Sequence, residues 1–107
     1  MLTIKGIAPG QLADVKRYVN ITWSDDDTDL RVMQIMVDAE AELNHLLGAE
    51  IDYFAPGAER RLYLDYCLYA WNKCADEFEE AYRKDILRVR HKYEVARFKK
   101  EKEGGSS

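Results

Sequence analysis

Two cysteines are the residues of this chain whose side chains could act as nucleophiles or form a disulfide. Cys67 and Cys74 are seven residues apart, which on a helix places both on one face, about 10 Å apart along the axis. That separation exceeds the roughly 7 Å that a disulfide allows between Cα atoms. We therefore expect two reduced thiols that pack in an apolar core, as in a cytosolic protein.

The histidines and acidic residues do not favour a catalytic or metal site. His45 and His91 share no ligand spacing with each other or with a cysteine. The acidic run at 25–29 lacks the alternating ligands, central glycine and distal glutamate of a calcium loop, so it is better interpreted as a helix start capped by Asp26 or Asp27. Phosphate loops, Cys-x-x-Cys and His-Glu-x-x-His motifs are absent. We expect no catalytic residue, no metal, no cofactor and no enzyme activity.

Apolar residues recur at helical spacing, and no segment alternates in the way that demands a strand. The spacing predicts helices opening at Pro9 and spanning about 28–47, with Gly48 ending the second and a loop at 49–57. Residues 58–103 contain neither glycine nor proline, and their apolar stripe never slips in phase. A rod of that length would measure nearly 70 Å, so a break is expected near 81–85, with Asp85 available as a cap. The predicted class is all-α, a small helical bundle with a long C-terminal helix or helix pair.

The chain has 107 residues, 47% of them apolar and 34% charged, which suits one small globular domain at 1–103. Residues 104–107 predict a flexible tail. Apolar runs fall far short of the ~20 residues of a membrane span, and the N-terminus lacks the apolar region of a signal peptide, so no membrane association is expected.

Charge is divided between the two parts of the chain. Residues 1–82 hold 7 basic and 16 acidic side chains, whereas residues 83–107 hold 9 basic and 4 acidic ones. A basic helix can be simply solvated or can touch nucleic acid, but this one also carries an apolar stripe, which favours a partner surface. That stripe comprises Ile86, Val89, Tyr93, Ala96 and Phe98.

Aromatic residues cluster at Tyr63, Tyr66, Tyr69 and Trp71. Such a cluster can stack bases or form a protein interface. The acidic surround, with Asp65 between the tyrosines, would repel phosphates. Core packing or a protein–protein contact is therefore the favoured interpretation, and a helical dimer closed through residues 63–82 is one form of it.

The order of these motifs resembles the head–tail connector (adaptor) family of tailed phages and prophages. Three blocks carry the resemblance and together span roughly residues 10–95: the short helix at 15–21, the acidic helix start at 26–30 with its continuation to Gly48, and a third block with Leu64, Tyr66, Tyr69, Trp71-Asn72, Phe78, Tyr82, Ile86-Leu87-Arg88 and Tyr93.

The resemblance implies a structural subunit, without catalytic residues, in a ring beneath the portal. It would contact the portal protein, a stopper or tail-completion protein and copies of itself, in the virion or in the host cytoplasm before assembly. The genome would pass through the ring without specific binding. If the chain is a connector, the sign of their charge alone leads us to expect Asp25, Asp26 and Asp27 to face that channel and keep DNA from sticking. The alternative is a small nucleic-acid-binding regulator that uses the basic C-terminal helix. The partner-binding residues expected are Arg83, Lys84, Arg88, Arg90, Lys92, Tyr93, Arg97, Lys99, Lys100, Ile51, Tyr53 and Phe54.

Overall fold

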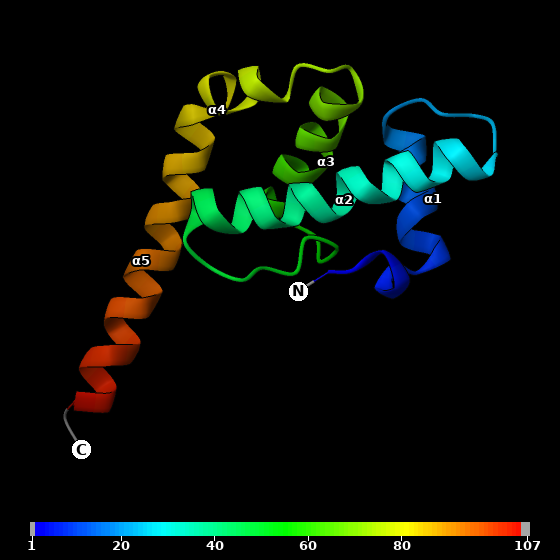
Figure 1. Ribbon diagram of the computed structural model, residues 1–107. Helices are drawn as coiled ribbons and strands as arrows, with labels where there is room; N and C mark the ends of the chain where they lie inside the picture. The colour runs from blue at the N-terminus through cyan, green and yellow to red at the C-terminus, as the bar shows by residue number, and fades with distance from the viewer. Residues whose placement is uncertain (1, 106–107) are drawn as a thin grey trace.

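In a computed structural model, which describes residues 2–105, the chain is built of helices joined by short loops (Figure 1). No strand occurs within residues 2–105, so the predicted all-α class is confirmed. In order, the elements are the 3-10 turn η1 (Ile4–Gly6), α1 (Pro9–Tyr18), α2 (Asp26–Leu47), α3 (Ala58–Trp71), the 3-10 turn η2 (Ala75–Glu77), α4 (Phe78–Ala81) and α5 (Arg83–Gly105).

Helix α2 is the central element, and its two ends show why it begins and stops where it does. The Asp25 carboxylate accepts a hydrogen bond from the backbone N–H of Thr28 at 2.8 Å, so Asp25 is the N-cap. The Thr28 hydroxyl donates a second hydrogen bond to the Asp25 carboxylate, at 2.7 Å. The expectation that Asp26 or Asp27 is the cap was therefore wrong by one or two residues. At the other end Gly48 has φ 70°, the left-handed conformation predicted for a glycine there.

The core lies where α2 meets α3 and the beginning of α5. Along α2 the buried residues are Val32, Met36, Ala39, Leu43 and Leu47, the helical stripe that the spacing predicts. Helix α3 contributes Leu62, Tyr63 and Cys67, and α5 contributes Ile86 and Val89. The buried Tyr63 hydroxyl donates to the carbonyl of Met36 at 3.0 Å, which joins α3 to α2 by a polar contact as well.

The long segment after residue 58 contains two breaks rather than one. The expected break near 81–85 is confirmed at Tyr82, where α4 ends and α5 begins, and Asp85 lies in the first turn of α5 rather than at its cap. The earlier break after Trp71 was not predicted. There Lys73 has φ 62°, and the backbone N–H of Cys74 donates to the carbonyl of Tyr69 at 2.8 Å.

This first break corrects the expectation for the cysteines. Cys74 lies outside α3, so it does not share a helix face with Cys67. Both thiols are free, with Cys67 buried and Cys74 half-buried. The break also allows Phe78 to stack on Tyr82, with ring centroids 4.6 Å apart, while Tyr66 and Tyr69 meet Phe78 edge-on. Of the four residues in the predicted aromatic cluster, Tyr66 and Tyr69 thus pack on Phe78, and Tyr63 is buried in the core.

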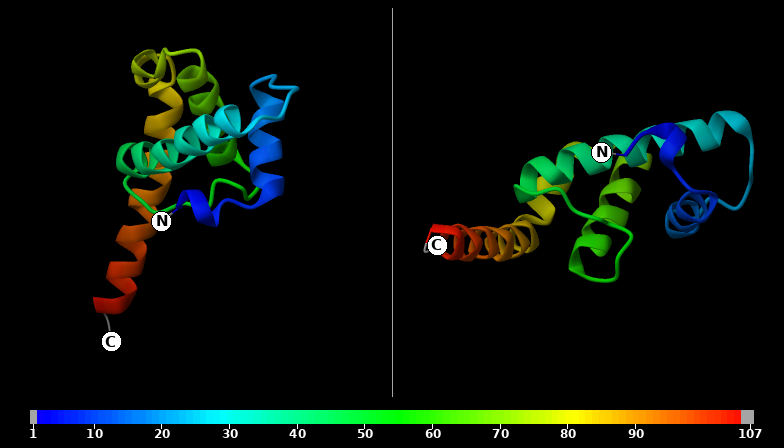
Figure 2. Two further views of the ribbon diagram at one scale, coloured as in Figure 1. Left: turned by 45° about the vertical axis from the view of Figure 1, so that its right-hand side comes forward. Right: turned by 90° about the horizontal axis from the view of Figure 1, so that it is seen from below.

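Helix α5 passes the body and continues away from it, as both views in Figure 2 show. The molecule is accordingly elongated, with extents of 55 × 29 × 19 Å. The helix runs through Gly104 and Gly105, where the tail was expected to begin, and residues 106–107 lie outside the described residues. Within the described chain, no helix combines the length and apolar character needed to cross a bilayer.

Candidate functional site

The first half of α5 is attached to the body by its inner face. Ile86 and Val89 are buried in the core and Tyr93 is half-buried beside them. Lys92 Nζ lies 2.9 Å from Glu59 Oε1, and this hydrogen bond raises the pKa of Lys92. Arg97 donates to the carbonyl of Gly48. These contacts hold α5 against α3 and the end of α2 as far as residue 97.

The basic residues expected to bind a partner therefore fall into two groups. The first group interacts with other residues of the chain. It contains Lys92 and Arg97, and also Arg88, which lies 3.9 Å from Asp85, and Arg90, which lies 3.2 Å from Glu94. The exposed side chains of Arg83, Lys84, Lys99 and Lys100 lie at the two ends of α5. The positive charge of α5 is thus partly neutralised along its middle.

The outward face of α5 carries a second apolar stripe that the sequence analysis missed. Leu87, Val95 and Phe98 are 55%, 39% and 66% exposed. With His91 they follow one another at steps of four, four and three residues, so they share one helix face. Phe98 was expected on the face of Ile86 and Val89, and this was wrong, because nine residues beyond Val89 a helix has turned halfway round. We call the four residues Leu87, His91, Val95 and Phe98 the outward face.

The loop between α2 and α3 was expected to supply three partner-binding residues. Tyr53 is 2% exposed, donates its hydroxyl to Asn44 Oδ1 at 2.8 Å and stacks on Tyr63 with ring centroids 5.2 Å apart. It is therefore a core residue, and the expectation that it contacts a partner is corrected. Ile51 and Phe54 are half-buried around it and keep part of their surface free.

The acidic start of α2 lies at the surface. Asp25, Asp26 and Asp27 are all exposed. The carboxylate of Asp25 is engaged as the cap, and its hydrogen bonds with Thr28 lower its pKa. Asp26 and Asp27 lie in the first turn of the helix, where negative charge is stabilised by the helix dipole.

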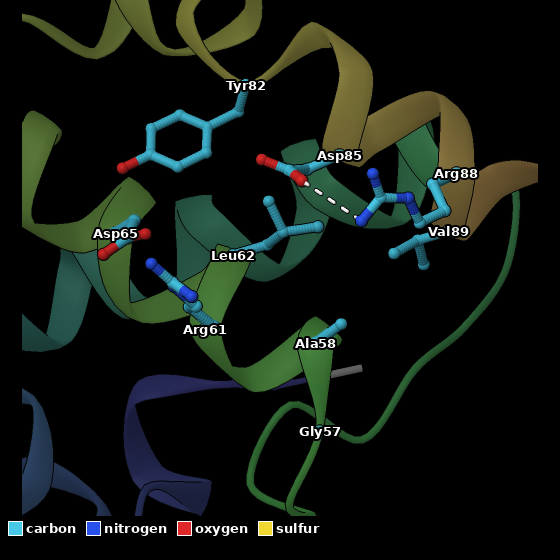
Figure 3. A pocket seen from close by; sticks show the side chains of 9 residues that line it. All are labelled: Gly57, Ala58, Arg61, Leu62, Asp65, Tyr82, Asp85, Arg88 and Val89. Carbon is cyan, nitrogen blue, oxygen red and sulfur yellow. Dashed lines mark ion pairs between the residues drawn. The ribbon is translucent and has the colours of Figure 1, made fainter.

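A cleft of about 470 Å³ separates α3 from the start of α5 (Figure 3). It combines apolar walls with two arginines and two aspartates, and within it Asp85 pairs with Arg88. The lining residues are Gly57, Ala58, Arg61, Leu62, Asp65, Tyr82, Asp85, Arg88 and Val89. The cleft therefore presents apolar surface together with charged groups of both signs.

Asp65 is the buried charge in this cleft and was not singled out from the sequence. It is 6% exposed and accepts a hydrogen bond from the hydroxyl of Tyr18, on α1. This bond raises the pKa of Tyr18 to about 12, and burial together with the nearby Asp65 raises the pKa of Tyr82 to about 12. The carboxylate thus connects α1, α3 and the junction of α4 with α5. The sequence does contain a signal for this buried charge, because Asp65 is an acidic residue inside an apolar stretch of helix.

Across the described part of the chain, no group of three or more His, Cys, Asp or Glu residues is arranged to hold a metal ion. Comparison with protein-family models, with curated proteins and with solved structures finds no match.

Proposed function

We propose that this chain is a structural subunit of a phage or prophage head–tail connector. In this role it forms a ring with copies of itself, binds the portal protein on one side and binds a stopper or tail-completion protein on the other. It acts by binding and not by catalysis, and its place is the head–tail junction of the virion, or the host cytoplasm before assembly. The motif order described above and the all-α fold with its long last helix support this proposal.

One observation carries the proposal: α5 is longer than the body can cover. Its inner face is buried only at Ile86 and Val89, whereas Val95 and Phe98 stay exposed beside Lys99 and Lys100. Exposed apolar side chains in a row on a protruding helix are typical of a surface that is covered in an assembly. The charge difference between the acidic body and the basic end of α5 suits neighbours that pack in sequence around a ring.

The test uses the purified chain and the portal protein of the same phage or prophage. We expect the chain to co-elute with portal rings in size-exclusion chromatography and to add a ring of density to one end of the portal in electron micrographs. A Lys99→Glu/Lys100→Glu variant should bind the portal more weakly, whereas Lys5→Glu, an exposed charge change at the other end of the chain, should not. If the wild-type chain fails to associate with the portal at micromolar concentrations, in low and physiological salt, the proposal is wrong.

Nucleic-acid binding remains the alternative, and the same protein tests it. A regulator that uses α5 would bind duplex DNA with an affinity that falls steeply with salt. Carboxylates beside Arg88, Arg90 and Lys92 lower the net positive charge of this part of α5, which weakens its attraction for phosphates. Nanomolar, salt-sensitive DNA binding by the isolated chain would favour the regulator over the connector.

A further inference from the structure

Asp65 is a buried carboxylate whose near neighbours are uncharged. It is 6% exposed, and the hydroxyl of Tyr18 donates a hydrogen bond to its Oδ1. The hydroxyl of Tyr82 also lies close enough for Asp65 to raise its pKa, and a tyrosine is neutral at pH 7. Among the side chains that the structure describes, none of the ion pairs includes Asp65. Because a buried charge is generally paired with an opposite one, two hydroxyls leave the negative charge of Asp65 without a compensating cation.

The cleft between α3 and α5 makes this carboxylate accessible from outside the molecule. Asp65 is one of the residues that line it, together with the apolar side chains of Leu62 and Val89 (Figure 3). The volume of about 470 Å³ lies within the range of roughly 300–1,000 Å³ that is typical of ligand sites. A long side chain with a charged end could therefore enter the cleft, with its methylene groups against the apolar walls and its charge close to Asp65.

Two arginines also line the cleft, and their exposure decides the sign of the charge that it favours. The side chain of Arg88 is 80% exposed and lies 3.9 Å from Asp85, and Arg61, one turn before Asp65 on α3, is exposed as well. Long side chains in water can turn aside at little cost, whereas the short, buried side chain of Asp65 keeps its charge in place. A cation inside the cleft therefore meets a fixed attraction, and an anion meets a fixed repulsion.

We propose that this cleft binds an arginine side chain of a partner protein, with its guanidinium beside the carboxylate of Asp65 and its aliphatic stem against Leu62 and Val89. A guanidinium is more weakly hydrated than the ammonium of a lysine, so it loses less when it leaves water for a partly closed site. It can also stack on an aromatic ring, and Tyr82 supplies one at the edge of the cleft. The site is a property of the free chain and does not rest on the proposed function.

Titration of the ¹⁵N-labelled full chain with N-acetylarginine amide, followed by NMR at constant ionic strength, tests the site. We expect the amide signals of Leu62, Asp65 and Val89 to shift and to saturate with a dissociation constant on the order of 1–10 mM, as suits a single side chain. N-acetylcitrulline amide has the same shape without the charge and should bind at least tenfold more weakly, and N-acetylglutamate amide should not bind. Shifts that do not saturate, equal binding of the citrulline probe, or preferred binding of the acidic probe would overturn the proposal.

Three variants locate the binding. Asp65→Asn keeps the shape of the side chain and an oxygen for the Tyr18 hydroxyl, and it should weaken binding of the arginine probe at least tenfold. Asp76→Asn is the matched control, because it removes the same charge from an exposed position outside the cleft, and it should change the affinity less than twofold. Ala58→Phe, at an exposed position that lines the cleft, should block binding while Asp65 stays intact. Equal losses in the two Asp→Asn variants would show a general attraction to the acidic body, and full binding by Ala58→Phe would show that the cleft is not the site; either result excludes the proposal.

Discussion

At the residue scale, the least expected feature is a carboxylate placed inside the helical body. Asp65 is buried on α3, and the hydroxyl of Tyr18 on α1 donates a hydrogen bond to it. A buried charge needs such donors, because an unpaired one loses hydration without compensation. The bond therefore ties the short α1 to α3 by a polar contact, in addition to the apolar contacts of Val15 and Val19 with the core.

Removing the donor should reveal how much this contact matters. Tyr18→Phe leaves the Asp65 carboxylate buried with one partner fewer, and we expect it to lower the free energy of unfolding by about 1–3 kcal/mol. The measurement is urea unfolding at pH 7. Tyr66→Phe is the control: Tyr66 is half-buried, and within residues 2–105 its hydroxyl makes no hydrogen bond. Equal losses in the two variants would show that the Tyr18–Asp65 bond contributes nothing specific.

The same tyrosines predict how stability depends on alkaline pH. In the unfolded chain a tyrosine titrates near pH 10, whereas in the folded protein the pKa of Tyr18 and that of Tyr82 are each raised to about 12. The folded protein therefore keeps these protons to higher pH, so their contribution to stability is complete below about pH 10 and is lost as the pH rises towards 12. Urea midpoints should be level from pH 7 to 9 and fall from pH 10 to 11.5, and the fall should be smaller for Tyr18→Phe. A midpoint that rises with pH in this window would contradict the assignment.

At the element scale, the helix ends marked by special residues could be predicted. Neither break after residue 58 is marked by glycine or proline, and only the one near Tyr82 was expected, from the length of the segment. Pro9 opens α1 and Gly48 closes α2, and both act through local backbone conformation that is visible in the sequence. The break after Trp71 has no glycine or proline, and apolar residues continue at helical spacing across it. It exists because packing Phe78 among Tyr66 and Tyr69 requires the chain to turn back there, which is a tertiary reason.

The break at Lys73 should be improved by a glycine. Lys73 has φ 62°, a conformation that costs a residue with a side chain about 1 kcal/mol. Lys73→Gly should therefore raise the free energy of unfolding by up to about 1 kcal/mol. Asn72→Gly is the comparison. Asn72 has φ −87°, so glycine there relieves no strain, costs entropy and removes the hydrogen bond that the Asn72 side chain donates to the Leu68 carbonyl at 2.9 Å, and it should destabilise. Thermal unfolding of both variants checks the prediction, and a destabilised Lys73→Gly would show that the turn does not limit stability.

At the scale of the whole molecule, the candidate partner surface on α5 and the loop before α3 could be predicted only in part, because it depends on contacts between segments that are distant in the sequence. The sequence correctly indicates a long, basic last helix with an apolar stripe, because charge and spacing are local properties. It does not reveal which face is buried: Phe98 lies on the opposite face to Ile86 and Val89, and Tyr53 belongs to the core. Which residues are buried depends on how α2 and α3 pack against α5. The spacing of apolar residues along one helix does not specify that packing.

The division of α5 into an anchored half and a free half gives a test of the molecule as a whole. A chain shortened to residues 1–96 keeps Ile86, Val89 and Tyr93, and among the described side chains it loses the hydrogen bond from Arg97 to Gly48. It should therefore fold with nearly unchanged circular dichroism and a melting temperature within a few degrees. A chain shortened to residues 1–85 loses the buried Ile86 and Val89, worth about 1.5–3 kcal/mol each, and the half-buried Tyr93 as well. That loss approaches the total stability of a small domain. The 1–85 chain should be largely unfolded. If the 1–96 chain unfolds instead, the far half of α5 stabilises the monomer and is not reserved for a partner.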